Sequence, residues 1–147
     1  MKRSAMIMFK LSVGTVWAQP PANCKPSALN IPGDPYPCVF PDRTALFRVS
    51  APNALKVQVR AGGGVDMVRK EIGLWYATTP PLVEGFHYNS ISIDGASVSD
   101  PSTRPYFGGG QWSSAIEVPA ADAEFYERKD VPHGVVREQS YFSTVTQ

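Results

Sequence analysis

The 147-residue sequence has few of the residue types from which catalytic and metal sites are built. It contains only two histidines and two cysteines. Neither cysteine, Cys24 or Cys38, has a second ligand at the short spacings that zinc sites use, so no metal or other cofactor is expected. With 14 basic against 13 acidic residues, the chain also lacks the basic surface that nucleic acid or a membrane would require.

Long apolar runs and catalytic motifs are missing as well. No apolar segment approaches the roughly 20 residues that span a membrane. The nearest approach to a serine-hydrolase turn is Gly95-Ala96-Ser97-Val98-Ser99, which lacks the second glycine. His87 lies in a strand-like pattern and His133 follows a proline, and neither has an obvious nucleophile nearby in sequence. The sequence therefore predicts no catalytic residues and a chain that is not itself an enzyme.

What the sequence does contain is an alternation of apolar and polar residues with a period of two. Fourteen prolines and twelve glycines interrupt this pattern and disfavour long helices. Such short, regularly spaced runs are typical of an immunoglobulin-like antiparallel β-sandwich, here of about seven to eight strands. The predicted strands cover residues 44–50, 55–60, 65–70, 74–79, 86–94, 96–99, 115–118 and 135–143.

Three segments are less regular. In 86–94 the aromatic residues Phe86 and Tyr88 share one face and Ile91 shares the other with Ile93, which suggests a bulge or burial on both faces. Residues 102–114, rich in glycine and aromatic residues, are expected to be irregular. Residues 120–128 fit either one helical turn or an extended connector.

The domain organisation follows from shifts in composition. Residues 1–18 resemble an export signal: Lys2 and Arg3 precede apolar residues, and Ala18 ends a plausible cleavage site, so we expect secretion. Residues 19–43 form a Pro-rich leading arm, residues 44–119 the sandwich, and residues 120–147 a linker and the start of a further domain. In an exported chain Cys24 and Cys38 can form a disulfide; the alternative is two unpaired thiols.

Aromatic side chains are the best candidates for binding. Tyr106, Phe107 and Trp112 lie in the Gly-rich segment, where they can stack on a sugar or pack against a neighbouring domain. Tyr36 in the leading arm and Trp75 on a strand are further candidates. For strand aromatics such as Trp75, Phe86 and Tyr88, a place in the core is the main alternative.

Several motifs carry a family resemblance. FRVSAPNALKVQV, GLWYATTPPLVEGFHYNSISIDG and VSDP, within residues 44–101, resemble family 48 carbohydrate-binding modules. NIPGDPYP, SSAIEVP and EFYERKDVPHGVVREQSYFS extend the likeness over residues 30–143 to the N-terminal module and linker of bacterial feruloyl esterases of carbohydrate esterase family 1. The two tryptophans that starch-binding family members use are absent at residues 61–67 and 96–98.

The resemblance implies an accessory module of a secreted esterase that acts on plant cell-wall polysaccharide. It is expected to bind xylan or arabinoxylan, to shape the substrate entrance of an adjoining C-terminal esterase domain, or both, and the family's catalytic residues would lie in that following domain. The alternatives are a structural domain that docks on the esterase without binding sugar, and an α-glucan-binding module.

Overall fold

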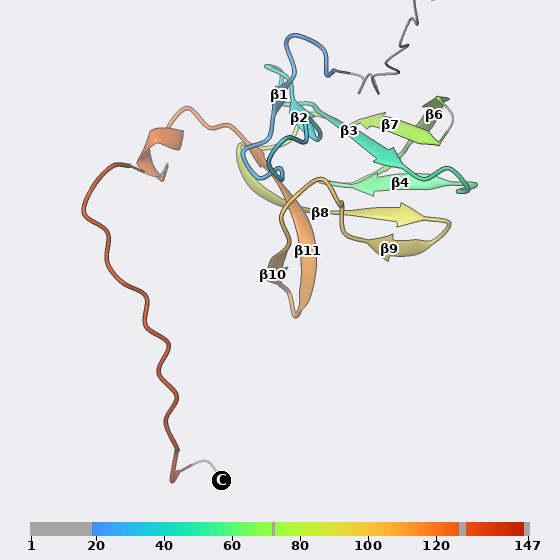
Figure 1. Ribbon diagram of the computed structural model, residues 1–147. Helices are drawn as coiled ribbons and strands as arrows, with labels where there is room; N and C mark the ends of the chain where they lie inside the picture. Colours follow the sequence, from blue (N-terminus) through green and yellow to red (C-terminus); the bar gives the residue numbers. More distant parts are fainter. Residues whose placement is uncertain (1–18, 72, 127–128, 146–147) are drawn as a thin grey trace, which may run out of the picture.

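The computed structural model describes residues 19–71, 73–126 and 129–145, which form two antiparallel sheets packed as a sandwich (Figure 1). In spatial order, the first sheet contains β1 (Lys25–Pro26), β2 (Cys38–Val39), β3 (Ala45–Ser50), β7 (Leu74–Thr78) and β6 (Val68–Glu71). The second contains β10 (Tyr106–Gly108), β11 (Gln111–Val118), β8 (Gly85–Ile93), β4 (Val57–Arg60) and β5 (Gly64–Asp66), with β9 (Ala96–Val98) also paired to β8. The predicted fold class is confirmed.

The core lies between the sheets and is made by alternate residues of their strands. Phe47 from the first sheet and Val59, Ile91 and Ile116 from the second are fully buried. Burying one such side chain stabilises the fold by about 1.5–3 kcal/mol. The alternation of apolar and polar residues in the sequence therefore reflects the burial of one face of each of these strands.

The leading arm covers the outer face of the first sheet. It supplies β1 and β2, which extend that sheet beyond β3. Cys24 and Cys38 form a disulfide, and they pack with Tyr36 and Tyr76 in a second buried cluster. The arm is thus joined to the sandwich by hydrogen bonds and by apolar packing, and the disulfide links two positions within the arm itself.

The strand predicted over 65–70 is wrong in one respect, because it divides between the sheets. Residues of β5 pair with β4 in the second sheet, whereas β6 pairs with β7 in the first. The chain crosses over at Met67, which is buried and donates its N–H to the carbonyl oxygen of Val57 at 2.8 Å. Alternation continues through the crossing, so the pattern alone did not reveal it.

The irregularities predicted for 86–94 and 102–114 are also corrected. Strand β8 runs from Gly85 to Ile93 with an uninterrupted register against β11 and then β4. Residues 106–118 form a hairpin, β10 and β11, whose turn at Gly109 and Gly110 has φ of 60° and 78°. Both values fall in the left-handed region that glycine adopts readily, as a tight hairpin turn requires.

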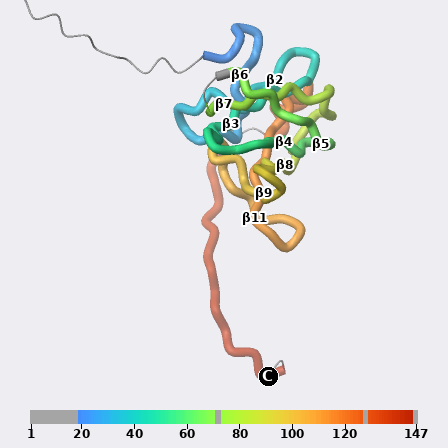
Figure 2. The backbone as a smooth tube through the Cα atoms, turned by 90° about the vertical axis from the view of Figure 1, so that its right-hand side faces the viewer, coloured from blue at the N-terminus to red at the C-terminus, as the bar shows by residue number. Residues whose placement is uncertain are grey.

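The C-terminal segment leaves the sandwich after β11. A single turn of 3-10 helix, η1 (Ala123–Phe125), follows, and residues 129–145 then run away from the sandwich in both views (Figures 1 and 2). The strand predicted over 135–143 is absent there, because no other described strand lies beside it to accept its hydrogen bonds.

The predicted export signal over 1–18 lies outside the described residues. Within the residues that are described, no helix is long and apolar enough to cross a membrane.

Candidate functional site

Three aromatic rings cover part of the outer face of the second sheet. Phe86 and Tyr88 alternate with core residues on β8 and therefore point away from the core. The Phe86 ring contacts Tyr88 at 5.0 Å and Tyr106 at 5.2 Å between centroids, edge to face in both cases. Ala115 pairs with Tyr88 in the register, and it is fully buried, which indicates that these rings cover it.

Tyr88 also lies against the β10–β11 hairpin. Its hydroxyl is 3.5 Å from the carbonyl oxygen of Phe107, and a Cβ atom added at Gly108 would collide with the ring. A larger residue at 108 would therefore have to displace the end of the Tyr88 side chain. The expectation that Phe86 and Tyr88 belong to the core is wrong, because they are 42% and 49% exposed.

Phe107 and Trp112 form a separate pair on the opposite side of this hairpin. They are register partners with ring centroids 5.5 Å apart, and they remain 62% and 65% exposed. Tyr106 is adjacent to Phe107 on β10 and so projects to the other face. The three aromatic candidates of this segment thus divide between two surfaces.

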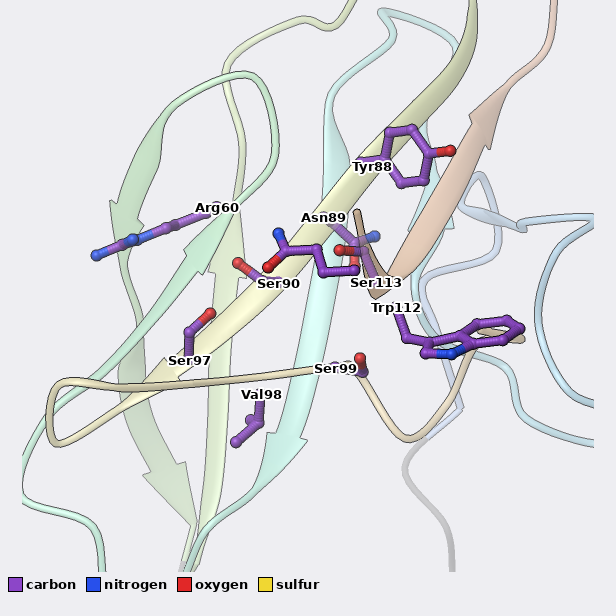
Figure 3. Close-up of a pocket in the computed structure, with 10 residues that line it drawn as sticks. Arg60, Tyr88, Asn89, Ser90, Ser97, Val98, Ser99, Trp112 and Ser113 are labelled. Carbon is purple, nitrogen blue, oxygen red and sulfur yellow. The ribbon is translucent and has the colours of Figure 1, made fainter. Parts of the chain in front are cut away.

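A pocket of about 310 Å³ opens beside Tyr88, and we call it the groove. It lies where β9 and β11 pair with the same edge of β8. Along β8, pairing with β11 ends at Asn89, and pairing with β9 starts at Ile91. Ser90 lies between these partners, opposite Arg60 on β4. The groove is lined by Arg60, Tyr88, Asn89, Ser90, Ser97, Val98, Ser99, Gln111, Trp112 and Ser113 (Figure 3).

A buried polar network supports the groove from below. The Ser114 hydroxyl accepts the N–H of Asp100 at 2.9 Å and donates toward Asn89, whose carbonyl oxygen is 2.9 Å away and whose side-chain Oδ1 is also in contact. These bonds tie the loop after β9 to both β8 and β11. Asn89 is itself 3% exposed, so this part of the groove wall is held in place.

The Asp100 carboxyl is buried in this network. Its Oδ1 accepts the Ser102 N–H at 2.9 Å, whereas Oδ2 has no hydrogen-bond partner among the described residues. Burial raises the pKa of Asp100 to about 6, the Ser102 N–H opposes this, and the negative charge of Asp34 adds to it.

The other two sequence candidates lie away from the groove. Tyr36 is 2% exposed in the arm cluster, where the Arg48 guanidinium lies 4.4 Å from its ring centroid. Trp75 is 8% exposed in the core and donates its indole N–H to the carbonyl oxygen of Ala51 at 2.9 Å. Neither ring is available to stack on a ligand.

Among the described residues, the two histidines lie in settings without a hydrogen-bonded nucleophile. His87 Nε2 lies 2.6 Å from the carbonyl oxygen of Val83, and His133 lies in the exposed C-terminal segment. In the described part of the chain, neither histidine is hydrogen-bonded to a serine, and no cluster of histidine, cysteine or carboxylate residues could hold a metal ion. The groove instead presents hydroxyl, amide and guanidinium groups together with the aromatic side chains of Tyr88 and Trp112.

The chain is similar in sequence to a curated enzyme. The chain is 38% identical, over 99% of its length, to an endo-1,4-beta-xylanase/feruloyl esterase of Xylanibacter ruminicola. It spans 21% of that protein's length. The chain resembles one part of that enzyme.

Two other comparisons add little. No family model matches the chain, so the resemblance to family 48 carbohydrate-binding modules is not confirmed. A crystal structure from Salmonella typhimurium, described as a candidate alpha amylase, has a TM-score of 0.45 and 22% identity over 53% of this chain and 14% of its own. A likeness of that size carries no argument about function.

Most of the groove was missed by sequence reasoning. Of the residues that line it, only Trp112 was a candidate. Arg60, Ser90 and Gln111 are ordinary strand residues in the sequence, and only the strand register brings them together. The exposed faces of a regular strand carry no pattern that separates a binding residue from a solvated one.

Proposed function

We propose that this chain is a non-catalytic accessory module of a secreted xylan-degrading esterase, and that its groove holds xylan or arabinoxylan. The observation that carries the proposal is the groove itself, which is lined by serine hydroxyls and by the aromatic side chains of Tyr88 and Trp112. The similarity to part of a xylanase/feruloyl esterase supports the choice of polysaccharide.

The groove would bind sugar through two kinds of contact. The faces of Tyr88 and Trp112 can pack against the apolar C–H face of a sugar ring. Ser90, Ser97 and Ser113 can each donate and accept a hydrogen bond, which matches the hydroxyl groups of a polysaccharide.

A structural role is the second candidate, and Phe107 is the observation that favours it. Phe107 packs on Trp112 but does not line the groove. An exposed aromatic pair on a projecting hairpin can dock on a neighbouring domain, here a C-terminal esterase domain, and can border the entrance to its active site. An α-glucan-binding module is the third candidate. It is disfavoured because this chain has Ser97 and Val98 in the region where the starch-binding family members carry a tryptophan.

Retention on insoluble polysaccharide distinguishes these candidates. We expect the 147-residue chain to bind insoluble arabinoxylan, and Tyr88→Ala and Trp112→Ala to weaken binding about tenfold each, as loss of about 1.4 kcal/mol requires. Phe125→Ala, which removes an 88% exposed ring outside the groove, is the matched control.

Other outcomes assign the other candidates. Equal retention of all variants, or none by the parent chain, would rule out the sugar-binding proposal and leave docking. Binding to insoluble amylose in place of arabinoxylan would favour the α-glucan module. Phe107→Ala should leave retention unchanged in the sugar-binding case, because Phe107 lies outside the groove.

Export of the protein is part of the proposal. The charged and apolar leader over 1–18 has the composition of a signal peptide, and the disulfide between Cys24 and Cys38 is the kind of bond that persists in oxidising compartments. Mass spectrometry of the protein recovered from the culture medium of an expressing bacterium should show a mature end at Gln19. Recovery only inside the cell with Met1 intact would contradict this.

A further inference from the structure

Arg60 supplies the only charge among the residues that line the groove. The others are serines, amides, a valine and aromatic residues, with no carboxylate. An arginine side chain is a cation with five N–H donors and no acceptor. The groove therefore carries a permanent positive charge and no negative one of its own.

Within the described part of the chain, the side chain of Arg60 makes no hydrogen bond or ion pair. Its register partners on either side are Gly64 and Ser90, which offer it no counter-charge. Asp66 on the neighbouring strand is already engaged: its Oδ1 accepts the Gln58 amide at 2.6 Å and lies 3.5 Å from the Lys56 ammonium.

Three other arginines have side-chain partners. Arg43 pairs with Glu84 at 3.7 Å, Arg48 lies 4.0 Å from Asp34, and Arg69 donates to the carbonyl oxygen of Pro52 at 3.0 Å. Arg60 thus differs from these three in facing a pocket with its donors free.

The strand positions place this charge to one side of the groove. Arg60 lies on β4, one strand from Ser90 on β8 and two from Ser113 on β11, a span of about 10 Å at the usual strand spacing. Figure 3 shows Arg60 and Trp112 extending in opposite directions from the two sides of the pocket. A sugar over Ser90 and Tyr88 would direct a substituent toward β4 and its guanidinium.

We infer that the groove selects a xylan bearing uronic-acid side groups over one whose side groups are all neutral. The inference rests on the proposed function and names the ligand class of the same site. Ring faces and hydroxyls recognise sugar, and a free guanidinium recognises a carboxylate, often through two parallel hydrogen bonds. A sugar that combines the two features is a uronic acid.

The test compares one polysaccharide with and without its charge. The probes are glucuronoxylan, the same glucuronoxylan with its carboxylates chemically reduced to alcohols, and neutral arabinoxylan. We expect the parent chain to bind glucuronoxylan about fivefold more tightly than the reduced form at low salt. The preference should shrink at 0.5 M NaCl, because the groove is open to solvent and salt screens exposed charges.

Arg60→Gln should abolish the preference while it retains binding to the reduced polysaccharide. Arg104→Gln is the matched control, since it removes the same charge from an exposed residue outside the groove, and it should keep the preference. Equal loss in both variants would mean general charge attraction and would overturn the inference.

Two further results separate this inference from the proposed function. If the parent chain binds charged and reduced xylan equally, and Trp112→Ala weakens both, the groove binds xylan but the inference is wrong. If the parent chain binds none of the three probes, the proposed function fails, and the inference fails with it.

Discussion

Asp100 is a buried carboxyl whose protonation is coupled to folding. Its pKa is raised to about 6 from 3.8, chiefly by burial. The folded protein therefore binds this proton more tightly than the unfolded chain does. The free energy of unfolding should fall as pH rises from about 4 to about 6, by about 3 kcal/mol in total from this group.

Asp100→Asn should remove this dependence while it keeps an oxygen to accept the Ser102 N–H. Urea unfolding at pH 3.5 and pH 7 measures the effect. The difference in unfolding free energy, variant minus parent, should increase by up to about 3 kcal/mol between pH 3.5 and pH 7, because only the parent loses stability over this range. Asp130→Asn, an exposed carboxylate in the C-terminal segment, is the control and should leave the difference unchanged. Parallel curves for parent and Asp100→Asn would show that Asp100 titrates normally.

Among the structural elements, the leading arm depends on its covalent link. The disulfide joins residues 14 apart and closes the loop that carries Tyr36 into the arm cluster. Closing a loop of this length lowers the entropy of the unfolded chain and stabilises the fold by about 3 kcal/mol.

The double variant Cys24→Ala/Cys38→Ala should therefore melt roughly 10–20 °C below the parent chain. Reduction of the parent with a phosphine should reproduce this loss, and the same reagent should not affect the variant. A melting temperature within about 2 °C of the parent would mean that the thiols are unpaired in solution, the alternative that the sequence left open.

The elements also show where sequence patterns succeed and where they fail. Strands β3, β4, β7 and β8 were predictable because one face of each is buried, and burial imposes the period of two. The β10–β11 hairpin was missed because its exposed rings and glycines break that period. Over 135–143 the opposite error occurred, since alternation without a partner strand does not make a strand.

The groove was less predictable than the fold. Its residues come from four separated stretches of sequence, on β4, β8, β9 and β11, and it exists only because β9 and β11 stop short of each other on β8. Nothing local marks such a gap. Trp112 was identifiable because a large ring beside glycines is hard to bury, whereas Arg60 has no comparable feature in the sequence.

At the scale of the whole molecule, the sandwich should fold without the C-terminal segment. Residues 129–145 are almost entirely exposed and run away from both sheets (Figure 2). A chain ending at Tyr126 should melt within about 1 °C of the parent and keep its retention on arabinoxylan.

A chain ending at Ser114 provides the contrast. It loses half of β11, including Ile116 and Val118 from the core, and should not fold cooperatively. A large loss of stability in the chain ending at Tyr126 would show instead that the segment packs on the sandwich, and that the predicted boundary near 119 is misplaced.

Strand β8 has neighbours along both of its edges. Residues 91–93 pair with β4 on one side and with β9 on the other, while the first half of the strand is held by β11. Their amide protons can reach solvent only when the second sheet comes apart as a unit, so in heavy water they should be the last of the chain to become deuterated. If amides of β3 outlast them in NMR exchange spectra, the first sheet and not the second is the last part of the molecule to open.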